Sequence, residues 1–82
     1  MRPLELTLYI RTYCHLCDEM RAAVEPWRAR LGLRLVEVDV DTDPELEARL
    51  GEKVPVLMAG GEEICHYFFD EDAFRQCLQI GP

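Results

Sequence analysis

The chain has 82 residues, of which 49% are hydrophobic and 30% are charged. That length suits a modest core, so we expect a single domain over residues 1–82. The formal net charge of −7 excludes the basic surface of a nucleic-acid binder and disfavours adsorption to anionic membranes. No apolar run approaches the roughly 20 residues that cross a bilayer, and the N-terminus lacks the apolar segment of a signal peptide. We therefore expect a cytoplasmic protein that does not bind membranes.

The first half of the chain predicts a strand, a helix and a second strand. Residues 4–10 (LELTLYI) are rich in strand-forming residues. Apolar side chains over residues 16–31 recur at the spacing of one helix face, and Gly32 supplies a stop. Pro26 lies inside this pattern and should kink the helix. Residues 33–40 (LRLVEVDV) alternate between apolar and polar side chains and predict the second strand.

The middle of the chain predicts a short helix followed by a third strand. Residues 42–45 (TDPE) match a capping box with an early proline, in which Thr42 caps the helix and Glu45 bonds back to it. The helix should end near Gly51. Residues 54–59 (VPVLMA) are apolar and predict a strand, with the proline at its beginning, where a missing N–H is tolerated.

The last third of the chain predicts a hairpin and a final helix. Gly60-Gly61 favours a two-residue turn, so residues 62–68 should return as a fourth strand. Residues 70–72 (DED) place negative charge at a helix start, where the helix dipole favours it. The complete order is β-α-β-α-β-β-α, with a parallel first pair of strands and an antiparallel hairpin. The sequence thus predicts an α/β fold with one mixed four-stranded sheet and helices packed on it.

One motif indicates a chemical function, and it is the Cys-x-x-Cys formed by Cys14 and Cys17. It follows the first strand and opens the first helix, where the helix dipole and unpaired backbone N–H groups favour a thiolate over a thiol. In a chain without a signal peptide, this spacing beside a βαβ pattern is typical of a redox dithiol. Cys14, at the exposed head of the helix, is the expected nucleophile. Cys17, one turn later, is the expected resolving thiol.

Three local features of the sequence have to be taken together. Residues 9–17 (YIRTYCHLC) pass from a strand through a basic residue and an aromatic residue to the Cys-x-x-Cys. Val54-Pro55 begins the third strand, and Gly60-Gly61 joins the last two strands. In this order and spacing they resemble the glutaredoxin family, and most closely a short bacterial glutaredoxin-like branch. The resemblance covers nearly the whole chain and implies a thioredoxin-like fold with thiol–disulfide oxidoreductase activity.

The resemblance also implies where a substrate binds. Pro55 should follow a cis peptide bond beside the dithiol, so that the backbone of Val54 can pair with an incoming peptide or thiol compound. Arg11 is expected either to add positive charge and contact a substrate carboxylate, or to be a solvated loop charge. Tyr13 either flanks the substrate groove or only packs against the fold.

The chain departs from the family at the dithiol and before the last helix. The usual Pro-Tyr between the cysteines is replaced by His15 and Leu16. As an imidazolium, His15 would stabilise the Cys14 thiolate, whereas the following Asp18-Glu19 would favour the neutral thiol. The net direction of the shift in the Cys14 pKa is left open. His15 as an exposed turn residue without a role is the alternative. Residues 67–72 (YFFDED) replace the family's Gly-Gly segment that binds glutathione.

The other two cysteines, Cys65 and Cys77, are interpreted as structural. Cys77 falls on the apolar face of the last helix, where a free cysteine behaves as a small hydrophobe. A zinc site formed by both dithiol sulfurs with Cys65 and His66 is the alternative. Adjacent strand residues point to opposite faces, so Cys65 and His66 could not readily bind one ion. We therefore expect no metal.

The sequence thus predicts a monomeric thiol–disulfide oxidoreductase that reduces disulfide-containing or glutathionylated substrates, either proteins or small molecules. No bound cofactor is required, because glutathione or a protein reductase would supply the electrons. The alternative belongs to another class: a thioredoxin-fold binding module whose dithiol does not turn over. Such a module would hold a metal, an iron–sulfur cluster between two copies, or a protein partner.

Overall fold

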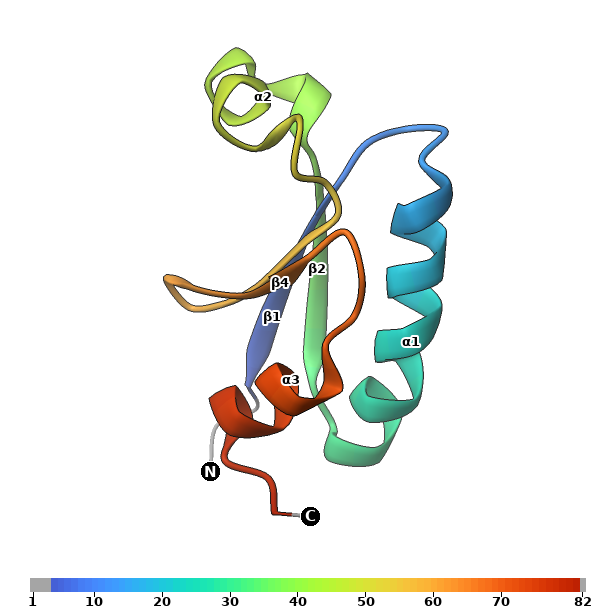
Figure 1. The fold of residues 1–82 in the computed structure, drawn as a ribbon, viewed down its shortest axis with the longest axis vertical. Helices are drawn as coiled ribbons and strands as arrows, with labels where there is room; N and C mark the ends of the chain where they lie inside the picture. The colour runs from blue at the N-terminus through green and yellow to red at the C-terminus, as the bar shows by residue number, and fades with distance from the viewer. Residues whose placement is uncertain (1–3, 82) are drawn as a thin grey trace.

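The computed structural model describes residues 4–81, which form one mixed sheet with helices against it (Figure 1). The elements in chain order are β1 (Glu5–Ile10), α1 (His15–Leu31), β2 (Arg34–Asp39), the 3-10 turn η1 (Val40–Thr42), α2 (Pro44–Leu50), β3 (Val56–Ala59), β4 (Glu62–His66) and α3 (Glu71–Leu78). The strands lie in the order β2-β1-β3-β4, with β1 parallel to β2 and the other pairs antiparallel. This confirms the predicted α/β fold, with η1 added before α2.

The core lies between the sheet and a layer formed by α1 and α3. On β1, Leu6 and Leu8 point into this core and are fully buried. Met20 and Val24 of α1 and Phe74 of α3 join the same buried cluster. The two helices therefore cover the same face of the sheet (Figure 1). No helix in residues 4–81 is both long and apolar enough to cross a membrane.

The helix that carries the Cys-x-x-Cys begins and ends where the sequence predicts. Cys14 is its N-cap, with an extended backbone. Gly32 is its C-cap and has a φ of 66°, a left-handed conformation that glycine adopts without steric cost. Pro26 lies inside the helix. The β1–α1 connection therefore delivers Cys14 to the end of the molecule where α2 also lies (Figure 1).

The predicted capping box at α2 is wrong. The N-cap is Asp43, whose side chain accepts a hydrogen bond from the Glu45 N–H at 2.9 Å. The Thr42 hydroxyl instead donates to the backbone oxygen of Asp39 at 2.7 Å and closes η1. Pro44 explains the difference, because a residue before proline is pushed into the extended conformation that an N-cap needs.

The hairpin strands are shorter than predicted. β3 starts at Val56 rather than at Val54, and β4 ends at His66 rather than at residue 68. Tyr67 has a φ of 65°, which an extended strand cannot accommodate. Its N–H still donates to the Pro55 carbonyl oxygen at 3.0 Å, so the start of β3 and the end of β4 stay in contact.

Candidate active site

The Cys14 sulfur lies at the N-terminus of α1. Its Sγ accepts a hydrogen bond from the Cys17 N–H over 3.2 Å, while the Cys14 carbonyl oxygen accepts the Asp18 N–H at 3.2 Å. The sulfur thus takes the place of the oxygen that usually caps a helix, where the dipole is positive. The same N–H and dipole stabilise a thiolate when the pair is reduced.

Cys14 and Cys17 differ sharply in exposure. The pair is joined as a disulfide with Cα atoms 5.2 Å apart. Cys14 is partly exposed, whereas only 1% of the Cys17 surface is accessible. Only the first sulfur can meet a large substrate in solution, and the second can be reached only from within the protein. This asymmetry matches the order of attack that the motif predicts.

Charged side chains next to the dithiol are paired with each other. His15 Nε2 lies 3.3 Å from a carboxylate oxygen of Glu19, and both side chains are well exposed. Asp18 accepts a hydrogen bond from Arg21 at 2.8 Å. The two opposing influences expected on Cys14 are therefore each partly neutralised by a neighbour in α1, and surface pairs of this kind are weak.

Arg11 is turned toward η1 and α2. Its guanidinium lies 3.1 Å from Asp41 and 3.2 Å from Glu47. The hydrogen bond with Asp41 and the charges of both carboxylates raise the pKa of Arg11. Its positive charge, which the sequence suggested for the thiolate or a substrate, is thus shared with two carboxylates of the protein.

The Tyr13 side chain projects into solvent. Its side chain is fully exposed, and its φ of 59° is left-handed. Full exposure excludes the packing role that was one of its two predicted alternatives. An exposed aromatic ring directly before Cys14 is available to a partner.

Val54 and Pro55 form the entry to β3. The Val54–Pro55 peptide bond is cis, which confirms the expectation from the family resemblance, and Pro55 is buried. Among the described residues, the N–H and carbonyl oxygen of Val54 make no backbone–backbone hydrogen bond. These two groups are therefore free to pair with an extended substrate backbone. Their role in binding stays a prediction.

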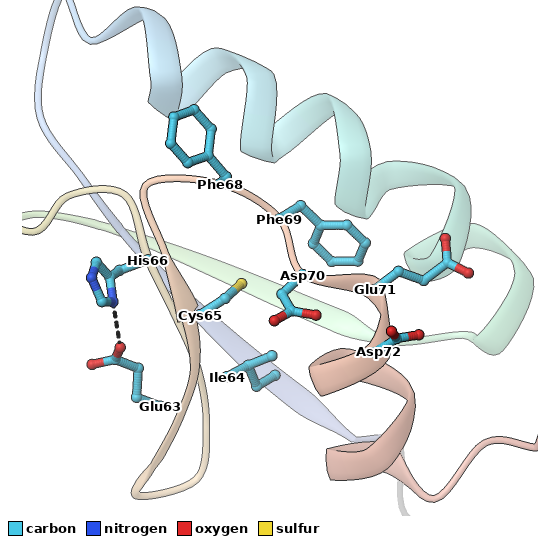
Figure 2. Close-up of a pocket in the computed structure, with 9 residues that line it drawn as sticks. All are labelled: Glu63, Ile64, Cys65, His66, Phe68, Phe69, Asp70, Glu71 and Asp72. Carbon is cyan, nitrogen blue, oxygen red and sulfur yellow. Dashed lines mark hydrogen bonds and ion pairs between the residues drawn. The ribbon is translucent and has the colours of Figure 1, made fainter.

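Sequence reasoning missed an open pocket of about 800 Å³ beside α3 (Figure 2). Its walls come from β4, the loop that follows and the first turn of α3, and its lining residues are Glu63, Ile64, Cys65, His66, Phe68, Phe69, Asp70, Glu71 and Asp72. Four of them are carboxylates, and Phe68 is 69% exposed. The signal was the run of aromatic residues before an acidic helix start, which the sequence interpretation treated only as a departure from the family.

Cys65 and His66 leave β4 on opposite sides, as predicted (Figure 2). Cys65 is buried, with its sulfur 3.9 Å from Met20 Sδ on α1, whereas His66 is exposed and lies 2.7 Å from Glu63. Burial raises the pKa of the Cys65 thiol, and it also raises the pKa of the Cys77 thiol. Within residues 4–81, no three His, Cys, Asp or Glu side chains are grouped as metal ligands would be.

The fold and the cysteine pair define a thioredoxin-fold protein with a Cys-x-x-Cys at the head of its first helix. The family model described as "Glutaredoxin-like domain (DUF836)" matches residues 5–79. The chain therefore belongs to this glutaredoxin-like family, which confirms the resemblance inferred from the sequence.

Solved structures and curated relatives agree with this placement. Protein Ne2328 from Nitrosomonas europaea is 33% identical with a TM-score of 0.84, and the match covers 94% of this chain and 93% of that one. Protein XcR50 from X. campestris is 38% identical with a TM-score of 0.74, over 94% and 99% of the two chains. Protein Rv0508 of Mycobacterium tuberculosis is 26% identical over 76 residues, which are 87% of this chain and 78% of the relative.

More distant structures show the fold alone. Thioredoxin 1 from Thermosipho africanus is 16% identical with a TM-score of 0.62, over 94% of this chain and 97% of that one. Buckwheat glutaredoxin, in complex with glutathione, is 20% identical with a TM-score of 0.56, over 92% and 70% of the two chains.

Proposed function

We propose that the protein is a thiol–disulfide oxidoreductase in which Cys14 is the nucleophile and Cys17 the resolving thiol. The Cys14 thiolate attacks one sulfur of a substrate disulfide and forms a mixed disulfide, and the other substrate sulfur leaves as a thiolate. Cys17 loses its proton and attacks Cys14 Sγ, which releases the second substrate sulfur. The substrate gains two electrons, and the protein is left with the Cys14–Cys17 disulfide.

The observation that carries this proposal is the unequal placement of the two sulfurs. A partly exposed sulfur caps α1, and a buried sulfur lies within disulfide distance of it. A structural disulfide gains nothing from a helix N-terminus, whereas a nucleophilic thiolate does. Family membership supports the same class of activity.

Other residues of the site have proposed roles in substrate binding. The free N–H and carbonyl oxygen of Val54 would pair with the substrate backbone, with Pro55 holding that segment in place, and the exposed ring of Tyr13 would border the groove. His15 would tune the pKa of Cys14 when it is protonated. We further propose that the protein acts in the cytoplasm, as a monomer and without a bound cofactor.

The source of electrons is either glutathione or a protein reductase, and the acidic pocket bears on this choice. Glutathione carries two carboxylates, and four carboxylates line the pocket. One lining residue, Cys65, contacts Met20 of α1, which is one turn beyond Cys17. Like charges repel, and salt screens that repulsion. We therefore expect the rate with glutathione to rise as sodium chloride is raised from 10 to 300 mM. A rate that falls with salt would contradict this expectation.

A redox titration tests the function directly. The protein is equilibrated with graded glutathione buffers, quenched with acid, alkylated and analysed by mass spectrometry. We expect a reversible Cys14–Cys17 disulfide with a midpoint near roughly −200 to −270 mV, as in thioredoxins and glutaredoxins. The variant Cys17→Ser should accumulate a mixed disulfide on Cys14, because the resolving thiol is gone. Cys77→Ser is the matched control and should titrate like the unmodified protein.

If the pair never forms a reversible disulfide, the oxidoreductase proposal fails. The binding-module alternative is then tested on the same preparation by measuring zinc and iron per chain. Stoichiometric metal that is lost in Cys14→Ser would establish that alternative.

A further inference from the structure

Arg11 joins two distant parts of the chain at the base of the loop that leads to the dithiol. Its Nε donates to both carboxylate oxygens of Asp41, at 3.2 and 3.1 Å, and its Nη2 donates to Glu47 at 3.2 Å. The partners lie 30 and 36 residues away in sequence, in η1 and α2. The guanidinium therefore fastens the end of β1 to the segment that follows β2.

A second tie lies beside the first. The Thr12 hydroxyl donates to Asp39 Oδ2 at 3.1 Å, while Asp39 Oδ1 accepts the Asp41 N–H at 2.9 Å. The carboxylate that receives Thr12 thus also shapes the turn that presents Asp41 to Arg11. Two consecutive residues of the loop are anchored to one turn, and Cys14 follows only two residues later.

The end of α2 closes around the guanidinium. Gly51 is buried, and a Cβ atom there would lie 2.8 Å from Arg11 Nη2 and 2.5 Å from the Glu47 carbonyl oxygen. Contacts under 3.0 Å force a shift, and the Glu47 oxygen is backbone. A side chain at position 51 would therefore clash with the α2 backbone, and it would also displace the Arg11 guanidinium.

We propose that Arg11 is a positioning residue for the dithiol and that it does not bind substrate. This proposal rests on the function proposed above, and it replaces the substrate contact that the sequence suggested for Arg11. Its donors are directed at Asp41 and Glu47, so its charge and geometry are already used within the fold. By anchoring the loop, it keeps Cys14 at the N-cap of α1, where the Cys17 N–H reaches the sulfur.

The expected effect acts through the reactivity of Cys14. A looser loop holds Sγ less firmly at the helix N-terminus, so the thiolate is less stabilised and the apparent pKa of Cys14 rises. Because the ion pairs are exposed, the effect should be modest, about a threefold fall in the rate of iodoacetamide labelling at pH 7.

Three variants distinguish positioning from two other roles for Arg11, which are substrate binding and an effect of its charge alone. We measure labelling of Cys14 against pH in reduced Arg11→Met, Asp41→Asn and the double variant, together with kcat and KM for a glutathionylated peptide. If Arg11 is a positioning residue, Cys14 is labelled about equally slowly in Arg11→Met and in the double variant, because removing Asp41 cannot restore the anchor. In both variants kcat should fall while KM stays unchanged. Arg11→Lys should recover only part of the rate, since an ammonium lacks the planar fork.

Other outcomes overturn the proposal. If Arg11 binds substrate, Arg11→Met raises KM and leaves the labelling profile of Cys14 unchanged. If its charge alone matters, the double variant returns to the labelling rate of the unmodified protein, because losing one positive and one negative charge restores the net charge of the cluster. Arg28→Met is the matched control, because Arg28 is similarly exposed and paired with Glu25 at the far end of α1. Labelling needs no turnover, so a protein without oxidoreductase activity would refute the proposed function and still test the anchor.

Discussion

The protein carries two pairs of cysteines, and their surroundings are opposite. Cys14 and Cys17 lie at the first turn of α1, joined as a disulfide, with a backbone N–H directed at the outer sulfur. Cys65 and Cys77 are free thiols that pack against the core from β4 and α3. Burial raises the pKa of both of these thiols. On the proposed function, the same side chain is therefore used in one place as a reagent and in the other as a small apolar group.

The position of each cysteine within its element sets the chemical environment of its sulfur. A helix N-terminus supplies positive potential and a donor to sulfur, whereas a buried site beside carboxylates penalises the thiolate. Cys65 shows the second case, because burial raises its pKa, and the charges of Asp70 and Glu63 raise it further. A hydrogen bond with the Asp70 backbone acts in the opposite direction and is outweighed by burial. If this contrast is correct, chemical and thermodynamic measurements should distinguish the two pairs. The largest difference is expected in turnover and the smallest in stability.

Loss of turnover in Cys14→Ser is the largest expected effect. A hydroxyl at this position is not ionised at neutral pH, so reduction of a disulfide peptide should slow by more than about a thousandfold. Cys77→Ser should leave the rate unchanged. The measurement is the rate of thiol release from the peptide. Equal loss in both variants would mean that the contrast between the pairs is false.

Thiol labelling of the reduced protein gives the next largest difference. We expect iodoacetamide at pH 7 to modify Cys14 at least about tenfold faster than Cys77, because only Cys14 is stabilised as a thiolate. Cys65 should remain unmodified until the protein is unfolded in urea. Mass spectrometry of peptides taken at timed intervals reports all the sites in one experiment. Comparable rates at Cys14 and Cys65 would refute the assigned environments.

The order of the elements could be read from the sequence because each local signal agreed with the fold. Alternation over residues 4–10, the helical spacing over residues 16–31 and the glycine turn at residues 60–61 fixed strand, helix and hairpin in turn. The predicted start of α2 and end of β4 were wrong because, in each case, one residue imposed its own backbone conformation. Pro44 moved the cap of α2 to Asp43, and the left-handed Tyr67 ended β4 early.

The candidate site was predictable only where its signal is local. The spacing of Cys14 and Cys17 and their place before a helix are visible in the sequence. The partners of Arg11 are not, because Asp41 and Glu47 reach it only through the parallel pairing of β1 with β2. The pocket beside α3 was missed for a different reason, because its lining comes from the single stretch 63–72, whose aromatic and acidic run was interpreted only as a departure from the family.

The stability of the oxidised protein should reveal the raised pKa of Cys65. Above about pH 8.5 the unfolded chain releases this proton, while the folded protein retains it, so the unfolded state binds fewer protons. The contribution to stability is thus fully present below the unfolded pKa and is lost as pH rises through the folded pKa. Urea unfolding between pH 7 and 10 should show a steeper loss for the unmodified protein than for Cys65→Ala. Tyrosines titrate in both proteins and cancel. Identical slopes would contradict the raised pKa.

The smallest effect is expected at Cys77. Its side chain is only half-buried against the edge of the core, so a hydroxyl in place of the thiol can still reach water. Cys77→Ser should change the free energy of unfolding by less than about 1 kcal/mol, whereas Cys65→Ser, at a buried site against Met20, should cost about 1–3 kcal/mol. Urea unfolding at pH 7 measures both. If the two costs were equal, the core cysteines would share one environment, and the depth of burial would not account for their inertness.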